Sequence, residues 1–208
     1  MMQVKPTRME LSNLKKRRTV AIRGHKMMKD KRDELVRRFI VLARRNKELR
    51  VEVEKKLNTA MKSFVLARAV MSGTEIEEAL LYPARAVQVE AKTQSILSIP
   101  VPKLTMDTQE GFVYPYGFAS TGADLDLAVQ SLAEVLPLML ELAEIEKACS
   151  RLADEIEKTR RRVNALEYVM IPQFDETIRR IQMKLDENER GNLTRLMKTK
   201  DMLQEQQK

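Results

Sequence analysis

The chain has 208 residues, of which 43% are hydrophobic, 33% are charged and 4% are aromatic, with six Gly and seven Pro. This composition excludes wholesale disorder and disfavours a compact β-rich fold, so a helix-rich fold is expected. The net charge of +8 is uneven, because residues 1–50 carry 17 Lys and Arg against 5 Asp and Glu. One end is therefore strongly basic, which suits nucleic acid, acidic lipid or an acidic protein alike.

A helix of some 60 residues is predicted to begin at Thr7. No proline lies between Pro6 and Pro83, and Thr7 and Glu10 are spaced as a capping box. A heptad pattern then places apolar residues at six successive d positions, whereas half of the a positions are polar. The d positions are Leu14, Ala21, Met28, Leu35, Leu42 and Leu49.

The middle of the chain predicts a short helix at 75–82 and then a β-hairpin. Apolar and polar residues alternate from Val87 to Lys92, and a second β-branched run extends from Ile96 to Val101. The following prolines and glycines rule out a continuous helix. We expect this hairpin to protrude and to contact another protein through six apolar residues. These are Val87, Val89, Ile96, Leu97, Ile99 and Val101.

A second long helix is predicted to resume at Ser120 or Thr121, either of which can cap it. Its apolar residues follow a 4-3 spacing from Leu142 to Met170, and after Pro172 the row continues displaced by about one residue, so a kink is expected there. The core residues expected from this arm are Val163, Leu166, Ile178, Ile181 and Leu185.

The predicted fold is therefore dominated by α-helix, with a long antiparallel two-helix coiled coil formed by arms 1–72 and 121–208. A short helix, the β-hairpin and a Pro/Gly-rich loop form the insertion at 73–120. With Met71 set near Leu140, Leu14 is expected near Leu196. The methionines are expected to adapt the core, although their flexibility also suits a surface that meets several packing environments.

No catalytic, metal or cofactor residues are expected. The chain has no Gly-rich phosphate loop, and the single His25 and single Cys149 are too few for a zinc site or a Cys-His nucleophile. The absence of a long apolar segment and of a second cysteine favours a cytoplasmic protein without direct membrane insertion.

Several strings resemble the D subunit of V-type and archaeal-type rotary ATPases. The run from Pro6 to Leu14, the run Lys29–Leu35 and above all the run Arg161–Tyr168, continuing to Ile171 and Pro172, resemble that family. Together they lie on both predicted arms, so the resemblance covers essentially the whole chain.

The resemblance implies a non-catalytic central rotor shaft that needs no cofactor. Its implied partners are a ring of three catalytic and three regulatory ATPase subunits, the F subunit of the stalk and a subunit that connects to the membrane rotor. The chain would then be peripherally associated with the membrane through the complex. The hairpin from Val87 to Val101 would contact other stalk components or tune the ATPase rate. Basic residues expected to face the ring are Arg8, Lys15, Lys16, Arg17, Arg18, Lys198 and Lys200.

Two other functions remain open from the sequence. A coiled-coil scaffold or tether without rotation explains the heptads but not the specific C-terminal string. The basic run Lys15–Arg18 before leucine heptads imitates a basic-zipper DNA-binding protein, but here the heptads run through the basic stretch. The γ subunit of F-type ATP synthases shares the two-arm design. It normally places a larger α/β domain between its arms than residues 84–120 can supply, so the length of the insertion favours the D subunit.

Overall fold

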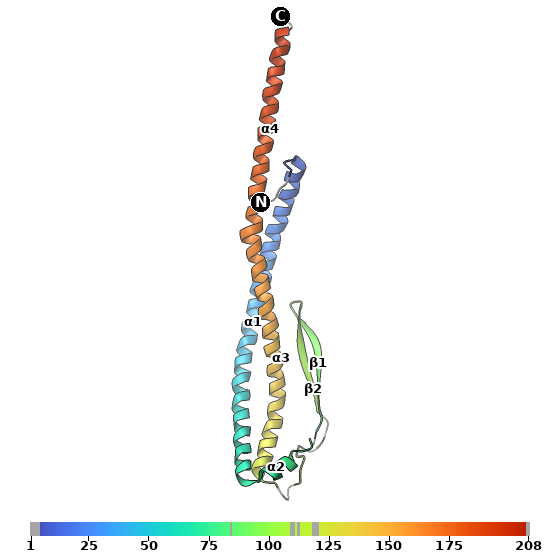
Figure 1. Ribbon diagram of the computed structural model, residues 1–208, viewed down its shortest axis with the longest axis vertical. Coiled ribbons are helices and arrows are strands. Elements are labelled where there is room, and N and C mark those ends of the chain that lie inside the picture. The colour runs from blue at the N-terminus through green and yellow to red at the C-terminus, as the bar shows by residue number, and fades with distance from the viewer. Residues whose placement is uncertain (1–4, 84, 109–110, 112, 118–120, 207–208) are drawn as a thin grey trace. The chain divides into compact units, whose positions relative to one another are not determined.

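The computed structural model describes residues 5–206 except 84, 109–110, 112 and 118–120 (Figure 1). It is mostly helical, with long helices at both ends and a small antiparallel hairpin between them, so the predicted fold class is confirmed. The elements are α1 (Arg8–Val70), α2 (Gly73–Ala79), β1 (Val87–Ile96), β2 (Ile99–Thr108), α3 (Ala123–Ala165), the π-helical turn η1 (Leu166–Met170) and α4 (Ile171–Gln206).

The chain divides into two compact units, each containing parts of both long arms. The terminal unit consists of Met1–Glu34 and Glu157–Lys208, and the middle unit is Leu35–Ile156. The start of α1 agrees in part with the predicted capping box. The Thr7 hydroxyl oxygen accepts a hydrogen bond from the Glu10 N–H at 3.2 Å, but the Thr7 N–H donates to the carbonyl oxygen of Lys5 at 2.9 Å and not to the Glu10 side chain.

The terminal unit pairs the first part of α1 with η1 and α4 in antiparallel directions. Leu14 and Ala21 are buried against three residues of α4, and Leu11, Leu166, Ile171 and Leu185 flank this cluster. The three α4 residues are Phe174, Ile178 and Ile181. Four predicted core residues, Leu14, Val163, Ile178 and Ile181, are buried, and Met28, Leu166 and Leu185 are half-buried.

The predicted register of the coil is wrong. Leu14 packs against the Phe174–Ile181 part of α4 and not near Leu196, an axial difference of roughly 25 Å at 1.5 Å per residue. The error arose at the turn, where Met71 packs with Leu125 of α3 and not with residues near Leu140. A seven-residue pattern repeats along the helix, so it cannot by itself fix the axial position of its partner.

A π-helical turn explains why the apolar row is displaced near Pro172. The Ile171 N–H donates to the carbonyl oxygen of Leu166, five residues earlier. Such a turn adds one residue to the helix, so the later apolar residues return to the face that packs on α1. Pro172 has no N–H, and the irregularity lies just before it, at Leu166–Met170. Met170, part of the predicted row, is 40% exposed.

The middle unit pairs the rest of α1 with α3 around two clusters. In the first, Leu35 packs with Ala148 and Leu152 of α3 and with the hairpin, and Leu42 flanks it. In the second, Ala67 and Met71 pack with Ile76 of α2 and Leu125 of α3. The predicted core residue Leu49 is also buried.

The start of α3 differs from the prediction. Ser120 lies outside the described residues, and the Thr121 hydroxyl donates to the carbonyl oxygen of Gly117 at 3.2 Å instead of capping the helix. The helix begins at Ala123, where the Leu125 N–H donates to the carbonyl oxygen of Gly122. Pro137, which the sequence pattern did not mark, lies inside α3 and cannot donate to the carbonyl oxygen of Ala133.

The hairpin has strands of ten residues each, with Val87 opposite Thr108 and Ile96 opposite Ile99. Its two-residue turn uses Leu97 at φ 51° and Ser98 at φ 67°, the left-handed conformation that tight hairpin turns require. The tip does not protrude as expected, because Ile99 and Val101 are buried against Leu35 and Leu152. The β-branched residues that suggested an exposed contact instead dock the hairpin on its own chain.

The expectation that methionines mainly fill the core is wrong. Among the methionines in the described part of the chain, Met71 is buried, Met28 and Met106 are half-buried, and eight are exposed. The aliphatic residues and alanines of the two arms form the core instead.

Thr159 tests whether an unsatisfied buried hydroxyl lowers the stability of the terminal unit. Its side chain is fully buried, and its hydroxyl has no hydrogen-bond partner among the described residues. Because an unsatisfied buried hydroxyl is destabilising by roughly 1–3 kcal/mol, Thr159→Val should raise the free energy of unfolding by about 1 kcal/mol in urea titrations.

The matched control is Thr177→Val. Thr177 is also buried, but its hydroxyl donates to the carbonyl oxygen of Gln173 at 2.7 Å, so its replacement should give no gain. An equal gain for both variants would show that the Thr159 hydroxyl is not unsatisfied in solution.

Candidate functional site

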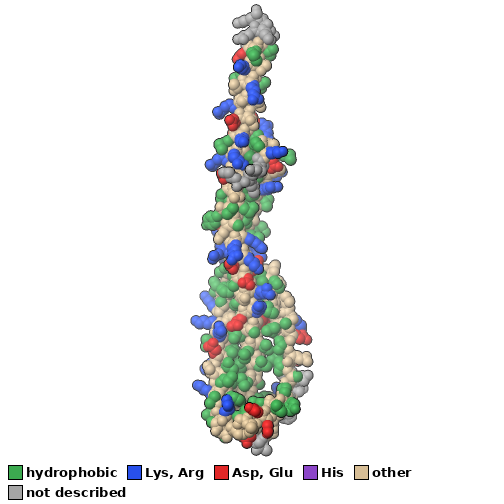
Figure 2. Space-filling view, in the orientation of Figure 1, with side chains coloured by type: hydrophobic (Ala, Val, Ile, Leu, Met, Phe, Trp, Pro, Cys, Tyr) green, Lys and Arg blue, Asp and Glu red, His purple; other side chains and the backbone are tan. Residues whose placement is uncertain are grey.

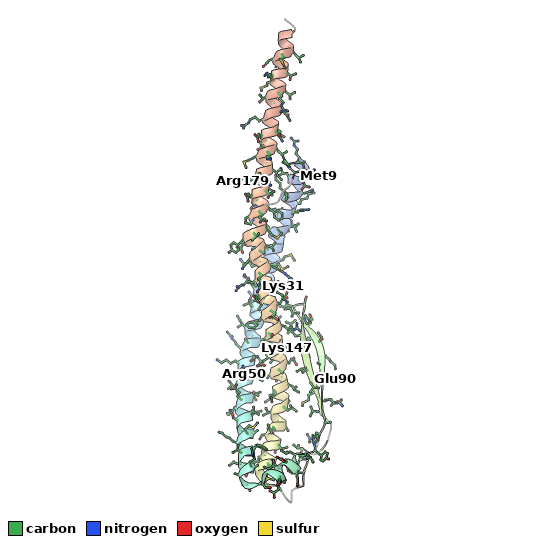
Figure 3. The ribbon with its side chains drawn as sticks, in the orientation of Figure 1. Met9, Lys31, Arg50, Glu90, Lys147 and Arg179 are labelled. Carbon is green, nitrogen blue, oxygen red and sulfur yellow. The ribbon has the colours of Figure 1, made fainter. Side chains whose placement is uncertain are left out.

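The terminal unit presents a basic surface. It carries 23 Lys and Arg against 13 Asp and Glu, a net charge of +10, whereas the middle unit carries −2. In the space-filling view, Lys and Arg side chains gather along both helices of this unit (Figure 2). Arg179, labelled in Figure 3, is one of the exposed basic residues of α4. Basic side chains of both helices therefore contribute to this surface.

The seven basic residues predicted to face a ring fall into two groups. Arg8 pairs with Glu189 and Arg18 with Asp175, so these two arginines join α1 to α4 within the unit. The other five are exposed and form no ion pair within the described residues. They are Lys15, Lys16, Arg17, Lys198 and Lys200. The five lysines and arginines of this second group are the better candidates for contact with a partner.

The end of α4 has an apolar face that α1 does not cover. Arg8, the first residue of α1, pairs with Glu189, so α4 runs on past α1 to Gln206 (Figure 1). Exposed apolar residues on this end are Leu193, Leu196, Met197, Met202 and Leu203. The sequence pattern missed this feature, because the wrong register placed Leu196 opposite Leu14. Comparing the lengths of the two arms from the turn could have revealed it.

The six predicted hairpin residues also divide into two groups. Ile99 and Val101 are buried, and Ile96 packs partly against the same cluster, so these three dock the hairpin. Val87, Val89 and Leu97 are 39%, 48% and 37% exposed. The exposed pair Val87 and Val89 lies at the base of the hairpin, away from the docked tip.

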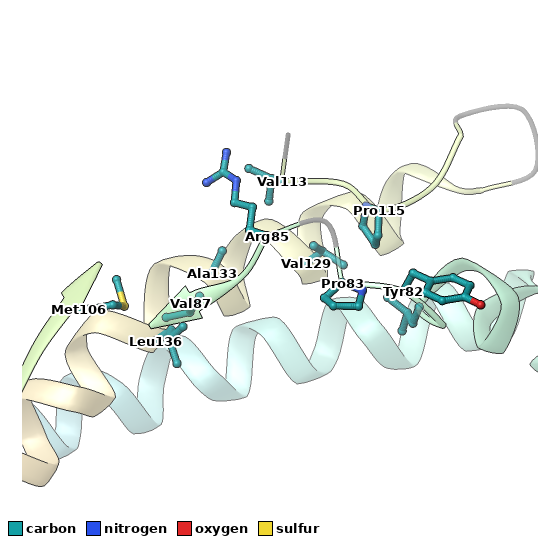
Figure 4. A pocket seen from close by; sticks show the side chains of 11 residues that line it. Tyr82, Pro83, Arg85, Val87, Met106, Val113, Pro115, Val129, Ala133 and Leu136 are labelled. Carbon is teal, nitrogen blue, oxygen red and sulfur yellow. The ribbon is translucent and has the colours of Figure 1, made fainter. Parts of the chain in front are cut away.

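A pocket of about 450 Å³ opens beside the hairpin base (Figure 4). Val87 and Met106 face α3 across it, and Val129, Ala133 and Leu136 form its α3 wall. The remaining lining residues are Leu80, Tyr82, Pro83, Arg85, Val113 and Pro115. The α3 residues were missed because they precede the apolar row that begins at Leu142, although exposed apolar residues outside the core pattern are a recognisable signal of a second contact face.

Two hydrogen bonds hold parts of the middle unit together, and burial raises the pKa of two of its side chains. The Leu104 N–H donates to the Glu144 carboxylate at 3.0 Å, which ties β2 to α3. The Tyr116 hydroxyl donates to Asp126 at 2.8 Å, and burial together with this bond raises the pKa of Tyr116 well above its usual range. Burial also raises the pKa of the Cys149 thiol, which makes it a poor nucleophile near neutral pH.

Comparison with known proteins identifies the family. A family model that describes the D subunit of ATP synthase matches residues 10–201. The chain is 57% identical over 210 residues to the V-type ATP synthase D subunit of Clostridium botulinum, with 99% of this chain and 97% of that protein covered. It is 59% identical over 208 residues to the V-type ATP synthase D subunit of Acetivibrio thermocellus, with 99% and 94% covered.

The chain belongs to the family of ATP synthase D subunits. The resemblance inferred from local sequence strings is therefore confirmed, and the match extends over both units. As a member of the D-subunit family, the chain is an accessory subunit of a V-type ATPase. No helix in the described part of this D subunit is long and apolar enough to cross a membrane.

The Arg18–Asp175 pair allows the coil register of this D subunit to be tested. Each side chain is about half exposed, at 42% and 49%, so the pair should contribute roughly 0.2–1 kcal/mol. Arg18→Asp and Asp175→Arg should each lower the free energy of unfolding, and the double variant should recover most of the loss. Urea titrations of all four proteins measure this coupling.

Arg17→Asp provides the control, because Arg17 is exposed and has no ion pair among the described residues. Asp175→Arg should not rescue it. A double Arg18/Asp175 variant whose destabilisation equals the sum of the two single effects would contradict the observed register.

Proposed function

We propose that this chain is the central rotor shaft of a V-type ATPase. In this role it couples ATP hydrolysis or synthesis in a ring of three catalytic and three regulatory subunits to rotation and ion transport through the membrane sector. Membership of the D-subunit family supports the proposal. The observation that carries it is that both units consist of antiparallel helices held by a buried apolar seam.

A shaft that transmits torque must resist sliding and unwinding of its helices. A single helix offers only its own hydrogen bonds against twisting, whereas paired helices must also break their shared core. In the terminal unit, Leu14 and Ala21 interlock with Phe174, Ile178 and Ile181. Ion pairs across the seam, such as Arg45–Glu141 at 3.1 Å in the middle unit, add to this at most modestly.

A shaft must also be asymmetric, because it has to place three chemically identical catalytic sites in different states. The paired elements of the terminal unit differ in sequence, and one contains the π-helical turn next to Pro172. The basic surface would meet the ring through contacts that are weak and quickly exchanged, since exposed ion pairs contribute only about 0–1 kcal/mol each. Such contacts can form and break at every step.

The basic-zipper alternative is disfavoured by the terminal unit. Leu14 and Ala21, which a zipper would use for dimerisation, are buried against α4 of the same chain, and Arg18 of the basic run pairs with Asp175. A non-rotary tether is consistent with the same packing. It is distinguished from a shaft by its partners, because a tether need not bind an ATPase ring.

The proposed assembly has three contacts. The terminal unit enters the ring, the F subunit of the stalk binds near the hairpin, and a further subunit connects the chain to the membrane rotor. The chain would thus be located on the cytoplasmic side and associated with the membrane only through the complex. We assign no catalytic role to the chain itself.

We further propose that the F subunit uses the hairpin base, where Val87 and Val89 are exposed and the 450 Å³ pocket is lined mostly by apolar side chains. The docked residues Ile96, Ile99 and Val101 would position the hairpin and not contact the partner directly. The exposed Leu97 at the tip remains a candidate contact.

The ring contact is tested by neutralising the five free basic residues of the terminal unit. Replacement of Lys15, Lys16, Arg17, Lys198 and Lys200 with Gln should weaken capture of the ring subunits and reduce the salt dependence of binding, because the attraction of charged surfaces is screened by salt. Pull-downs of the tagged chain, read by mass spectrometry at several salt concentrations, measure both effects.

The matched control neutralises five exposed lysines of the middle unit, namely Lys47, Lys55, Lys62, Lys103 and Lys147, and should leave ring capture unchanged. If the unaltered chain captures no ring subunits, the rotor proposal fails and the tether remains. If it captures the ring and neutralisation has no effect, the basic residues only solvate the coil.

The hairpin base is tested by replacing two apolar residues of the pocket. Val87→Gln with Leu136→Gln should reduce capture of the F subunit several-fold, because both side chains face a pocket that would exclude water when occupied. The control is Val51→Gln, an apolar residue of α1 that is 59% exposed and does not line the pocket. Equal capture by both variants would remove the hairpin base as the binding site.

A further inference from the structure

Exposed methionines are concentrated in the terminal unit. Among the described residues, this unit exposes 13 large hydrophobic side chains, of which six are methionine, whereas the middle unit exposes 17, of which two are methionine. The six are Met9, Met27, Met170, Met183, Met197 and Met202. The methionine content of the apolar surface, and not the amount of apolar surface, therefore distinguishes the two units.

Methionine differs from the other apolar residues in how it adapts to a partner. Its side chain is unbranched, has three rotatable bonds and carries a polarizable sulfur, so it can fill pockets of different shape. Leucine and valine are branched and have fewer accessible shapes. A methionine surface suits a contact that must be re-formed against different neighbours.

The exposed methionines of α4 do not form one stripe. The core stripe of α4 consists of Phe174, Ile178, Ile181 and Leu185. At about 100° per residue, Met183 lies roughly 170° from the centre of this stripe, while Met197 and Met202 lie roughly 130° and 90° away on opposite sides. Met9 and Met27 add exposed positions on α1. A partner that binds one face would need one stripe, whereas an enclosing partner would meet all these positions.

The charge of the terminal unit indicates the chemistry of that partner. The methionines lie among side chains whose net charge is +10. A complementary surface would therefore combine acidic groups with shallow apolar pockets. A second copy of this chain is a poor fit, because it would bring the same positive charge.

We propose that the exposed methionines of the terminal unit form a self-adjusting contact with an enclosing protein collar that is acidic and apolar. This inference rests on the proposed function, in which the collar is the ATPase ring. As the shaft turns, each ring subunit meets a different side of it, and the methionines repack against each one. The contact therefore has a similar strength in successive orientations, and no single orientation is stabilised so strongly that it slows rotation.

Methionine oxidation tests where the collar lies. In the free chain, dilute hydrogen peroxide should oxidise the eight exposed methionines to sulfoxides quickly and the buried Met71 slowly, as read by mass spectrometry of peptides. In the complex assembled with the ring, the six methionines of the terminal unit should be protected several-fold relative to the free chain.

Three results of this footprint would overturn the inference in distinguishable ways. If the chain captures no ring subunits, the proposed function fails and the collar with it. If the ring is captured but the six methionines stay as reactive as in the free chain, the proposed function stands and the methionine contact is wrong. If protection appears at high concentration of the free chain alone, self-association covers the surface.

The role of flexibility is tested by substitution. Replacement of Met27, Met183, Met197 and Met202 with Leu keeps the apolar character but adds a branch, so capture of the ring should stay near the unaltered level while ATP-driven rotation slows several-fold. Replacement of the same four with Gln keeps an unbranched chain but makes it polar, so capture should fall.

The matched control is Met61→Leu with Met139→Leu in the middle unit, where both residues are also exposed. Rotation should be unchanged in this control. Because all these positions are at the surface, thermal melts monitored by circular dichroism should show folded proteins. A terminal-unit leucine variant that rotates at the unaltered rate would contradict the proposal.

Discussion

The structure depends on one constraint, which is that α1 must bury a narrow apolar stripe against helices that return in the opposite direction. Only 4% of the residues are aromatic, so the seam is formed mainly from leucine, isoleucine, valine and alanine. Helix propensity alone does not hold such long helices in a fixed geometry; tertiary packing of their apolar face does. The hairpin and the short helix α2 both pack against this seam and depend on it for their positions.

Irregularities within the seam connect the fold to its proposed use. The π-helical turn inserts one residue before Pro172 and brings the later apolar residues back into phase with α1. The same turn leaves Tyr168, Val169 and Met170 exposed. The π-helical turn thus changes both the face that packs on α1 and the outer surface of the helix. The α4 side of the terminal unit therefore differs from the α1 side.

The division of polarity between the units suggests a division of tasks. The terminal unit joins positive charge with flexible methionines, a combination suited to a partner that changes its relative orientation. The middle unit has a nearly neutral balance of charge, a docked hairpin and a pocket of defined shape beside Val87 and Leu136. Fixed shape suits a partner that stays bound. Both tasks depend on side chains that lie outside the seam. Packing between the helices does not restrict the types of these side chains.

The sequence by itself determined most of the secondary structure and the helical class, because heptad spacing, the Thr7 cap and the alternation after Val87 are local signals. It also carried the family resemblance. Only the tertiary structure decided the axial register, the docking of Ile99 and Val101, the exposure of the methionines and the pocket beside α3. These features depend on which residues far apart in the chain meet, and a repeating apolar pattern allows several such pairings with similar local order.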